Sequence, residues 1–157
     1  MKQARKIYLF WIALSEAVGF LSGWLSRDGT AIFGETAIQP PLSPPAIVFP
    51  VVWTVLYALM GIGAARVSLT PAAPARSRGL NLWIAQLIVN FFWSLIFFNA
   101  GAYGFALLWL VLLILLVLWM MLEFRKTDPL AALLQIPYLL WLAFAAYLNY
   151  GVWLLNH

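Results

Sequence analysis

Tryptophan side chains deep inside apolar runs are the residues of this chain best suited to bind another molecule. Trp53 and Tyr57 stand four residues apart, so their rings share one face of a helix. Trp53 lies farther into its apolar run than a tryptophan at the lipid headgroups needs to be. Indole rings at this depth can line a cavity for a flat apolar molecule, and their N–H groups can bond its carbonyl oxygens.

Two further apolar runs combine rings with amides. One helical face of the run 80–98 carries Trp83, Gln86, Asn90, Trp93 and Phe97. In the run 130–155, Trp141, Ala145 and Asn149 follow at four-residue spacing, which gives a ring, a gap and an amide. Amides in hydrocarbon must find partners or face a cavity. The stripes therefore either hold a bundle together or line a ligand cavity, and the residues alone leave both readings open.

Composition excludes most other chemistry. The sequence has no cysteine and a single histidine, His157, which rules out thiolate nucleophiles, disulfides and histidine clusters. It contains no Ser/His/Asp set, no HExxH motif and no phosphate-binding loop, so we predict no catalytic residue, no metal site and no cofactor. Glu16 is a carboxylate near the middle of an apolar run, and it is either functional or only packs.

The overall composition places these residues in a membrane. Of 157 residues 65% are hydrophobic and only 9% are charged, whereas a soluble domain has about 25% charged residues. The apolar runs predict an all-α integral membrane protein, a single domain over 1–157 with a bundle of five transmembrane helices. The predicted helices are 7–25, 46–67, 80–98, 105–122 and 130–155. A Gly- and Pro-containing loop over 27–45 is long enough to act as a lid.

Three expectations concern the packing of these helices. The run 105–122 has no polar residue, so we expect it to be the most lipid-exposed helix. Gly19 and Gly23 form a GxxxG pair, which permits close contact with a neighbouring helix. The tryptophans near helix ends are expected to form an interfacial belt: Trp11, Trp24, Trp83, Trp109, Trp119 and Trp153.

The positions of the cations predict the orientation. Of nine Lys and Arg residues, three lie at the N-terminus, three around the second predicted connection and two in the fourth. Only Arg27 lies on the other side. The positive-inside rule then puts the N-terminus in the cytoplasm and the C-terminus outside. Because topology accounts for the net charge of +4, we expect no nucleic-acid partner.

Three blocks of residues, in order along the chain, carry a resemblance to a known family. They are Pro44-Pro45, Phe49, Val52-Trp53-Thr54, Leu56-Tyr57 and Met60-Gly61; Ala85-Gln86-Leu87, Asn90, Trp93 and Phe97-Phe98; and Pro137-Tyr138-Leu139, Trp141, Leu142-Ala143-Phe144-Ala145 and Leu148-Asn149-Tyr150. They resemble the second, third and fifth helices of the TspO/MBR family, tryptophan-rich sensory proteins related to the mitochondrial translocator protein. The resemblance covers essentially the whole chain.

The resemblance implies a five-helix membrane protein, often a dimer, that binds ligands under its first loop. The implied ligands are porphyrins such as protoporphyrin IX, and isoquinoline or benzodiazepine compounds. On this basis we expect a porphyrin receptor or sensor in a bacterial cell membrane, with a homodimer left open. The expected ligand-binding residues are Phe49, Trp53, Tyr57, Asn90, Trp141, Ala145, Leu148 and Asn149.

Two other functions stay open, and the sequence departs from the family pattern in two places. The alternatives are light-dependent porphyrin breakdown, with Trp53 and Trp141 as candidate residues, and transport of tetrapyrroles. Phe33-Gly34 stand where the family often has Trp-Tyr, and Gln39 stands where it has Lys. No cation follows Tyr150 in the last helix, so specific cholesterol binding is not expected.

Overall fold

Five long helices form the protein, and the computed structural model describes all of residues 1–157. The long helices are α1 (Lys2–Leu25), α3 (Val48–Ser68), α4 (Pro74–Ser94), α5 (Tyr103–Thr127) and α7 (Ile136–Leu155). A π-helical turn, η1 (Leu95–Asn99), continues α4, and the short helix α6 (Pro129–Leu133) precedes α7. Each of the five is long and apolar enough to cross a membrane, which confirms the predicted fold class.

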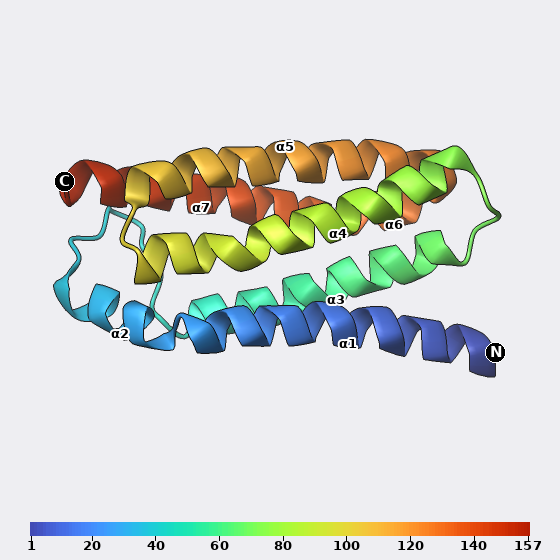
Figure 1. The fold of residues 1–157 in the computed structure, drawn as a ribbon, viewed down its shortest axis with the longest axis horizontal. Helices are drawn as coiled ribbons and strands as arrows, with labels where there is room; N and C mark the ends of the chain where they lie inside the picture. The colour runs from blue at the N-terminus through green and yellow to red at the C-terminus, as the bar shows by residue number, and fades with distance from the viewer.

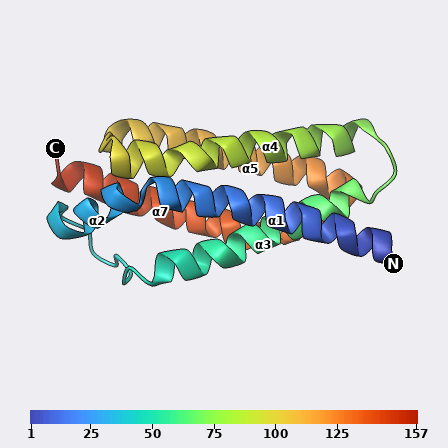
Figure 2. The same cartoon turned by 60° about the horizontal axis from the view of Figure 1, so that its bottom comes forward.

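The long helices run side by side along the long axis of the molecule (Figures 1 and 2). α1 packs mainly against α3, α4 against α5, and α5 against α7. The N-terminus and the α3–α4 connection lie at one end of the bundle, and the C-terminus and α2 lie at the other (Figure 1). We call the end with α2 the outer end.

The segment predicted as a loop over 27–45 contains a helix. α2 (Arg27–Thr36) follows α1 after the single residue Ser26, and Asp28 in its first turn interacts favourably with the helix dipole. The sequence lacks an apolar stripe here, and the helix docks on η1 through the Phe33 ring and through Gly29, which lies against the Phe98 backbone. Phe33 lies 5.2 Å from Phe97 and 5.3 Å from Phe98, between ring centres. Only residues 37–47 form the extended connection that the prolines predict.

The expectation that the run 105–122 is the most lipid-exposed helix is wrong. Of an 18-residue apolar stretch in α5, 28% of the residues are buried inside the protein, against 11% in the corresponding stretch of α1. α5 buries Ala106, Leu110, Leu113, Val117 and Met120, mainly against α4 and α7. Between protein and lipid tails an apolar side chain has little preference, so shape complementarity rather than polarity decides which helix is central.

The predicted tryptophan belt is also wrong for Trp83. Its side chain is fully buried, and its Nε1 donates a hydrogen bond to the Met60 carbonyl at 3.0 Å. The Trp11 ring packs edge-on against it, with 5.1 Å between ring centres. Trp24, Trp119 and Trp153 are exposed near helix ends. Position along a helix therefore does not tell an interfacial tryptophan from one that bonds across the bundle.

Glycine permits α1 and α3 to approach closely, though not in the way the GxxxG pair predicts. Gly61 of α3 lies against the backbone of Ile12, and Gly19 lies against the ring of Tyr57. Gly23 has no neighbour within 4 Å of where a Cβ would stand. The tight contact is thus confined to the part of α1 before Gly23.

Candidate ligand-binding site

A chain of hydrogen bonds joins α3, α4 and α7 inside the bundle. The Tyr57 hydroxyl donates to Asn90 Oδ1 at 2.6 Å, and Asn90 Nδ2 donates to the Tyr138 hydroxyl at 2.7 Å. The Tyr138 hydroxyl in turn donates to Gln86 Oε1 at 2.7 Å. All four side chains are buried, and we call them the polar network. Two of the amides that the sequence places in hydrocarbon thus find partners in tyrosine hydroxyls, as burial in a membrane requires.

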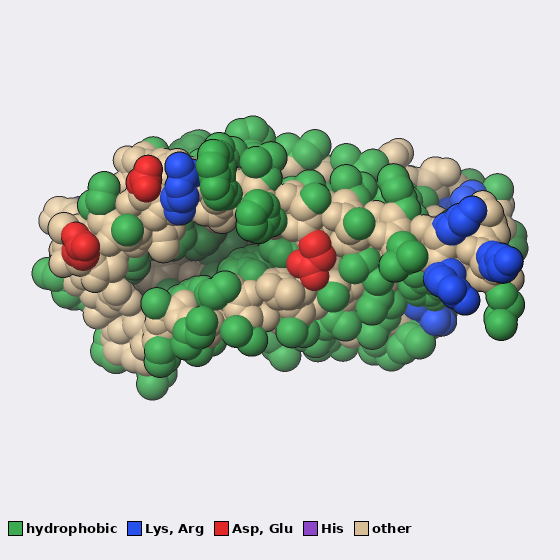
Figure 3. Space-filling view, turned by 90° about the horizontal axis from the view of Figure 1, so that it is seen from below, with side chains coloured by type: hydrophobic (Ala, Val, Ile, Leu, Met, Phe, Trp, Pro, Cys, Tyr) green, Lys and Arg blue, Asp and Glu red, His purple; other side chains and the backbone are tan.

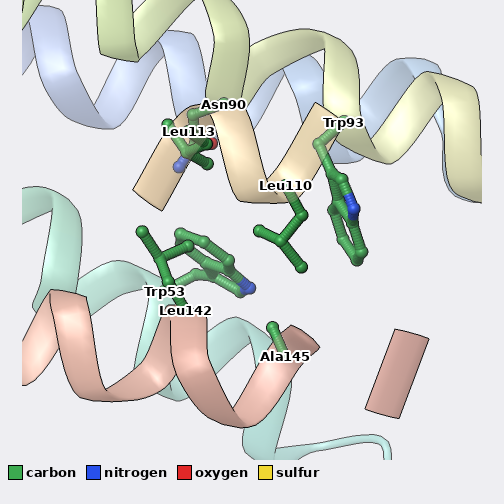
Figure 4. A pocket seen from close by; sticks show the side chains of 7 residues that line it. All are labelled: Trp53, Asn90, Trp93, Leu110, Leu113, Leu142 and Ala145. Atoms are coloured by element: carbon green, nitrogen blue, oxygen red, sulfur yellow. The ribbon is translucent and has the colours of Figure 1, made fainter. Parts of the chain in front are cut away.

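A small cavity adjoins the polar network (Figure 4). It is lined by Trp53, Asn90, Trp93, Leu110, Leu113, Leu142 and Ala145. Asn90 is the only polar residue in this lining. The cavity volume is about 10 Å³, room for about one water molecule.

The two indoles of the cavity differ in their hydrogen bonding. Trp93 Nε1 donates to Asn149 Oδ1 at 3.1 Å, and Asn149 Nδ2 donates to the Tyr103 carbonyl at 2.8 Å. Trp53 Nε1 has no hydrogen-bond partner in the protein, and Figure 4 shows its nitrogen directed toward the space between Leu110 and Ala145. The cavity therefore contains one indole donor that is free to bond a ligand.

The structure brings some of the predicted site residues together and separates others. Trp53, Asn90 and Ala145 line the cavity. Tyr57 and Asn149 lie one contact behind it, since Tyr57 bonds Asn90 and Asn149 bonds Trp93. The remaining three, Phe49, Trp141 and Leu148, do not line it.

Trp141 instead lines a groove between α3 and α7, and Phe49 contacts it with 5.8 Å between ring centres. The groove has a volume of about 440 Å³. Its lining is Val51, Val52, Val55, Leu56, Pro137, Leu140, Trp141 and Phe144, and it is entirely apolar. Trp53 and Trp141, the candidates for pigment chemistry, therefore lie in two different hollows.

A third hollow opens on the face formed by α1 and α3, toward the outer end (Figure 3). It arises because α1 leaves α3 after Gly19: the Ser22 hydroxyl donates to the Phe91 carbonyl of α4 at 2.8 Å. On the other side of α3, Val51 and Val55 line the groove toward α7 and are more than half exposed, at 58% and 54%. The first half of α3 thus has open space toward both α1 and α7.

The connection 37–47 is fastened along α7 above the cavity. Asn156 accepts a hydrogen bond from the Ile38 N–H at 2.8 Å and donates one to the Ile38 carbonyl at 2.7 Å. The Tyr147 hydroxyl donates to the Pro41 carbonyl at 2.8 Å, and Pro40 packs on Gly151. This connection covers the outer end of α7, while α2 packs on η1, and we call the segment 27–47 the cover.

Sequence reasoning missed several residues of the site. Tyr138 belongs to one of the three blocks that resemble the family. The sequence does not indicate that its hydroxyl bonds Asn90 and Gln86, because a tyrosine also suits a membrane interface. Leu110, Leu113 and Leu142 line the cavity without any polar mark in the sequence. Trp93 lies three residues after Asn90 on the same predicted helix face, and this spacing could have identified it as a residue of the site.

Glu16, the other candidate for chemistry, is half-buried on α1 and forms no ion pair. No group of three or more His, Cys, Asp or Glu side chains is placed to hold a metal ion. The arrangement as a whole offers stacking surfaces, one free indole donor and one amide, which is the chemistry of binding.

Comparison with known proteins identifies the family. The sequence profile of the TspO/MBR family matches residues 11–154. The tryptophan-rich protein TspO of Chlorobaculum tepidum is 35% identical over 146 residues, 92% of each chain. The translocator protein of Homo sapiens is 39% identical over 147 residues, which cover 92% of this chain and 87% of that protein. Protein CrtK of Rhodobacter capsulatus is 41% identical over 119 residues, 75% of this chain and 74% of that one. By both its sequence and its five-helix architecture, the chain belongs to the TspO/MBR family.

Proposed function

We propose that this chain is a membrane receptor that binds a porphyrin, or a similar planar apolar ligand, between α3, α4, α5 and α7. The observation that carries the proposal is the lining of the cavity, where Trp53 offers a ring and an unbonded N–H beside the amide of Asn90. Apolar and aromatic walls with a few placed polar groups are typical of sites for small apolar molecules. The relatives' names include a tryptophan-rich sensory protein and a translocator protein, which supports a sensing or translocating role.

Binding requires the cavity to widen, because pockets for such ligands have volumes of about 300–1,000 Å³. The wall best able to move is the first half of α3, which carries Trp53 and has open space on two sides. Trp53 contacts Tyr57 and Tyr138 through its ring, at 5.4 and 6.2 Å between ring centres, and makes no hydrogen bond. Moving it outward therefore breaks no buried hydrogen bond.

The test is a titration with protoporphyrin IX in the dark, followed by quenching of tryptophan fluorescence in purified protein. Ala145→Leu places an isobutyl group in the cavity lining, and Ala143→Leu makes the same change at an exposed position on the same helix. We expect saturable quenching at micromolar ligand or below, about −8 kcal/mol or better. Ala145→Leu should weaken binding about tenfold or more, and Ala143→Leu should leave it unchanged.

Two results would contradict the proposal. Quenching that does not saturate, and is identical in all three proteins, would mean that the pigment only partitions into detergent. Equal affinity in Ala145→Leu and Ala143→Leu would place the ligand away from this cavity. Far-UV circular dichroism of each variant shows whether the helices are retained.

We also infer that the end bearing the N-terminus faces the cytoplasm of a bacterial cell. The Lys and Arg side chains gather at that end in Figure 3, as the positive-inside rule demands of a cytoplasmic face. A single cysteine placed at residue 2 or 157 can be labelled without interference, because the chain has none of its own. In intact cells, a membrane-impermeant maleimide should react only with the C-terminal cysteine.

A further inference from the structure

A porphyrin with two carboxylate groups poses a problem that the cavity does not solve. The lining has one amide, Asn90, and no cation. A carboxylate buried in hydrocarbon without a positive partner is strongly disfavoured. The carboxylates of such a ligand must therefore reach an end of the bundle where a cation and water are available.

Arg27 is the only Lys or Arg at the outer end. Every other cation belongs to the N-terminal end or to the two connections beside it: Lys2, Arg5, Lys6, Arg66, Arg76, Arg78, Arg125 and Lys126. Several of these are already engaged, since Arg66 pairs with Asp128 and both Arg78 and Lys126 pair with Glu123. Arg27 pairs with no carboxylate.

The Arg27 side chain is held in place by its neighbour. Its guanidinium carbon lies 4.0 Å from the ring centre of Trp24, and Nη1 donates a hydrogen bond to the Trp24 carbonyl at 2.6 Å. These contacts use the face of the guanidinium and one of its N–H groups. The other donors remain exposed to solvent, in a plane that suits a carboxylate.

The cavity lies within reach of this end. Trp53 is five residues into α3, about 8 Å from the start of the helix at 1.5 Å per residue. The hollow on the α1–α3 face lies toward the same end (Figure 3), and α1 ends two residues before Arg27. The edge of a planar ligand stacked on Trp53 therefore faces the end of α1.

We propose that Arg27 binds a carboxylate of the ligand and thereby selects carboxylated tetrapyrroles over neutral planar molecules. This inference rests on the proposed function. Trp24 orients the guanidinium before the ligand arrives, which lowers the entropy cost of forming a two-point contact.

The test compares protoporphyrin IX with its dimethyl ester, which has the same ring and no negative charge. Both are titrated into the unchanged protein, Arg27→Gln, Arg27→Lys and the control Arg125→Gln. Arg125 is an exposed cation without an ion pair at the opposite end. We expect Arg27→Gln to weaken binding of the acid roughly fivefold to tenfold and of the ester less than about twofold. Arg27→Lys should restore part of the loss, and Arg125→Gln should change neither ligand.

The outcomes separate this inference from the proposed function. Equal weakening of both ligands in Arg27→Gln would mean that Arg27 only supports the fold of the cover, and would overturn the inference. No weakening of either would place the carboxylates elsewhere and overturn it as well. If the unchanged protein binds neither pigment saturably, the proposed function itself fails and this inference fails with it.

Discussion

Replacing Tyr138 by Phe tests whether the polar network stabilises the bundle. The Tyr138 side chain is fully buried, and its hydroxyl forms two hydrogen bonds, one accepted from Asn90 and one donated to Gln86, both at 2.7 Å. The substitution removes one oxygen and keeps the ring, so the packing changes little. Gln86, which is fully buried, then loses its tyrosine partner, and Asn90 loses one of its two.

The expected loss follows from the number of bonds. Inside membrane proteins one side-chain hydrogen bond contributes about 0.6–1.7 kcal/mol, so Tyr138→Phe should lower the free energy of unfolding by about 1–3 kcal/mol. Tyr57→Phe removes a single bond, the one to Asn90 at 2.6 Å, and should cost about half as much. Tyr150 is 48% exposed and its hydroxyl makes no hydrogen bond, so Tyr150→Phe serves as the matched control.

Unfolding in mixed micelles of increasing dodecyl sulfate content, followed by far-UV circular dichroism, gives the comparison. We expect the order of stability to be unchanged protein and Tyr150→Phe first, Tyr57→Phe next and Tyr138→Phe last. Equal stability of Tyr138→Phe and Tyr150→Phe would refute the reasoning, because the network would then contribute nothing measurable. A larger loss in Tyr57→Phe than in Tyr138→Phe would show that the number of bonds does not decide the outcome.

Two further predictions concern the glycine contact and the cover. Gly61→Ala should lower the free energy of unfolding by about 1–3 kcal/mol, because the new Cβ atom would press on the Ile12 backbone. Gly23→Ala should be neutral or slightly stabilising in the same assay, because no atom lies within 4 Å of its Cβ position. Phe33→Ala should speed amide hydrogen exchange across α2 about tenfold or more, since the ring that docks the helix is lost, while Ile32→Ala at an exposed position should not. Unchanged exchange in Phe33→Ala would mean that other contacts hold α2.

The sequence was sufficient to predict the five helices and the inward faces of two of them, for one physical reason. An amide cannot face hydrocarbon without a partner, so the spacing of Gln86 and Asn90 identifies the buried face of α4. The structure confirms that both are buried, together with Asn149 of α7. Asn90 both bonds Tyr138 and lines the small cavity, so a residue that holds the bundle together can also line a cavity.

What the sequence could not predict are contacts between groups that tolerate several environments. Leucine suits lipid and protein equally, so nothing marked Leu110 and Leu113 as cavity residues. α2 has no apolar stripe to predict it, and its docking depends on Phe97 and Phe98, which extend from a π-helical turn. Such turns depend on how the neighbouring helices pack and have no simple sequence signal.

The two halves of α3 are held to different degrees, which suits the receptor function proposed above. From Tyr57 onward the helix is fastened: Tyr57 bonds Asn90, Gly61 touches the backbone of α1, and Met60 accepts a hydrogen bond from Trp83. Before Tyr57 it bonds no neighbouring helix through a side chain, and Trp53 is held without a hydrogen bond, by apolar packing on the core and by ring contacts of about 0.5–1.5 kcal/mol each. A ligand that stacks on Trp53 replaces those contacts with its own and leaves the polar network intact. Under the proposed function, binding therefore moves the first half of α3 at little cost, because the polar network does not have to change.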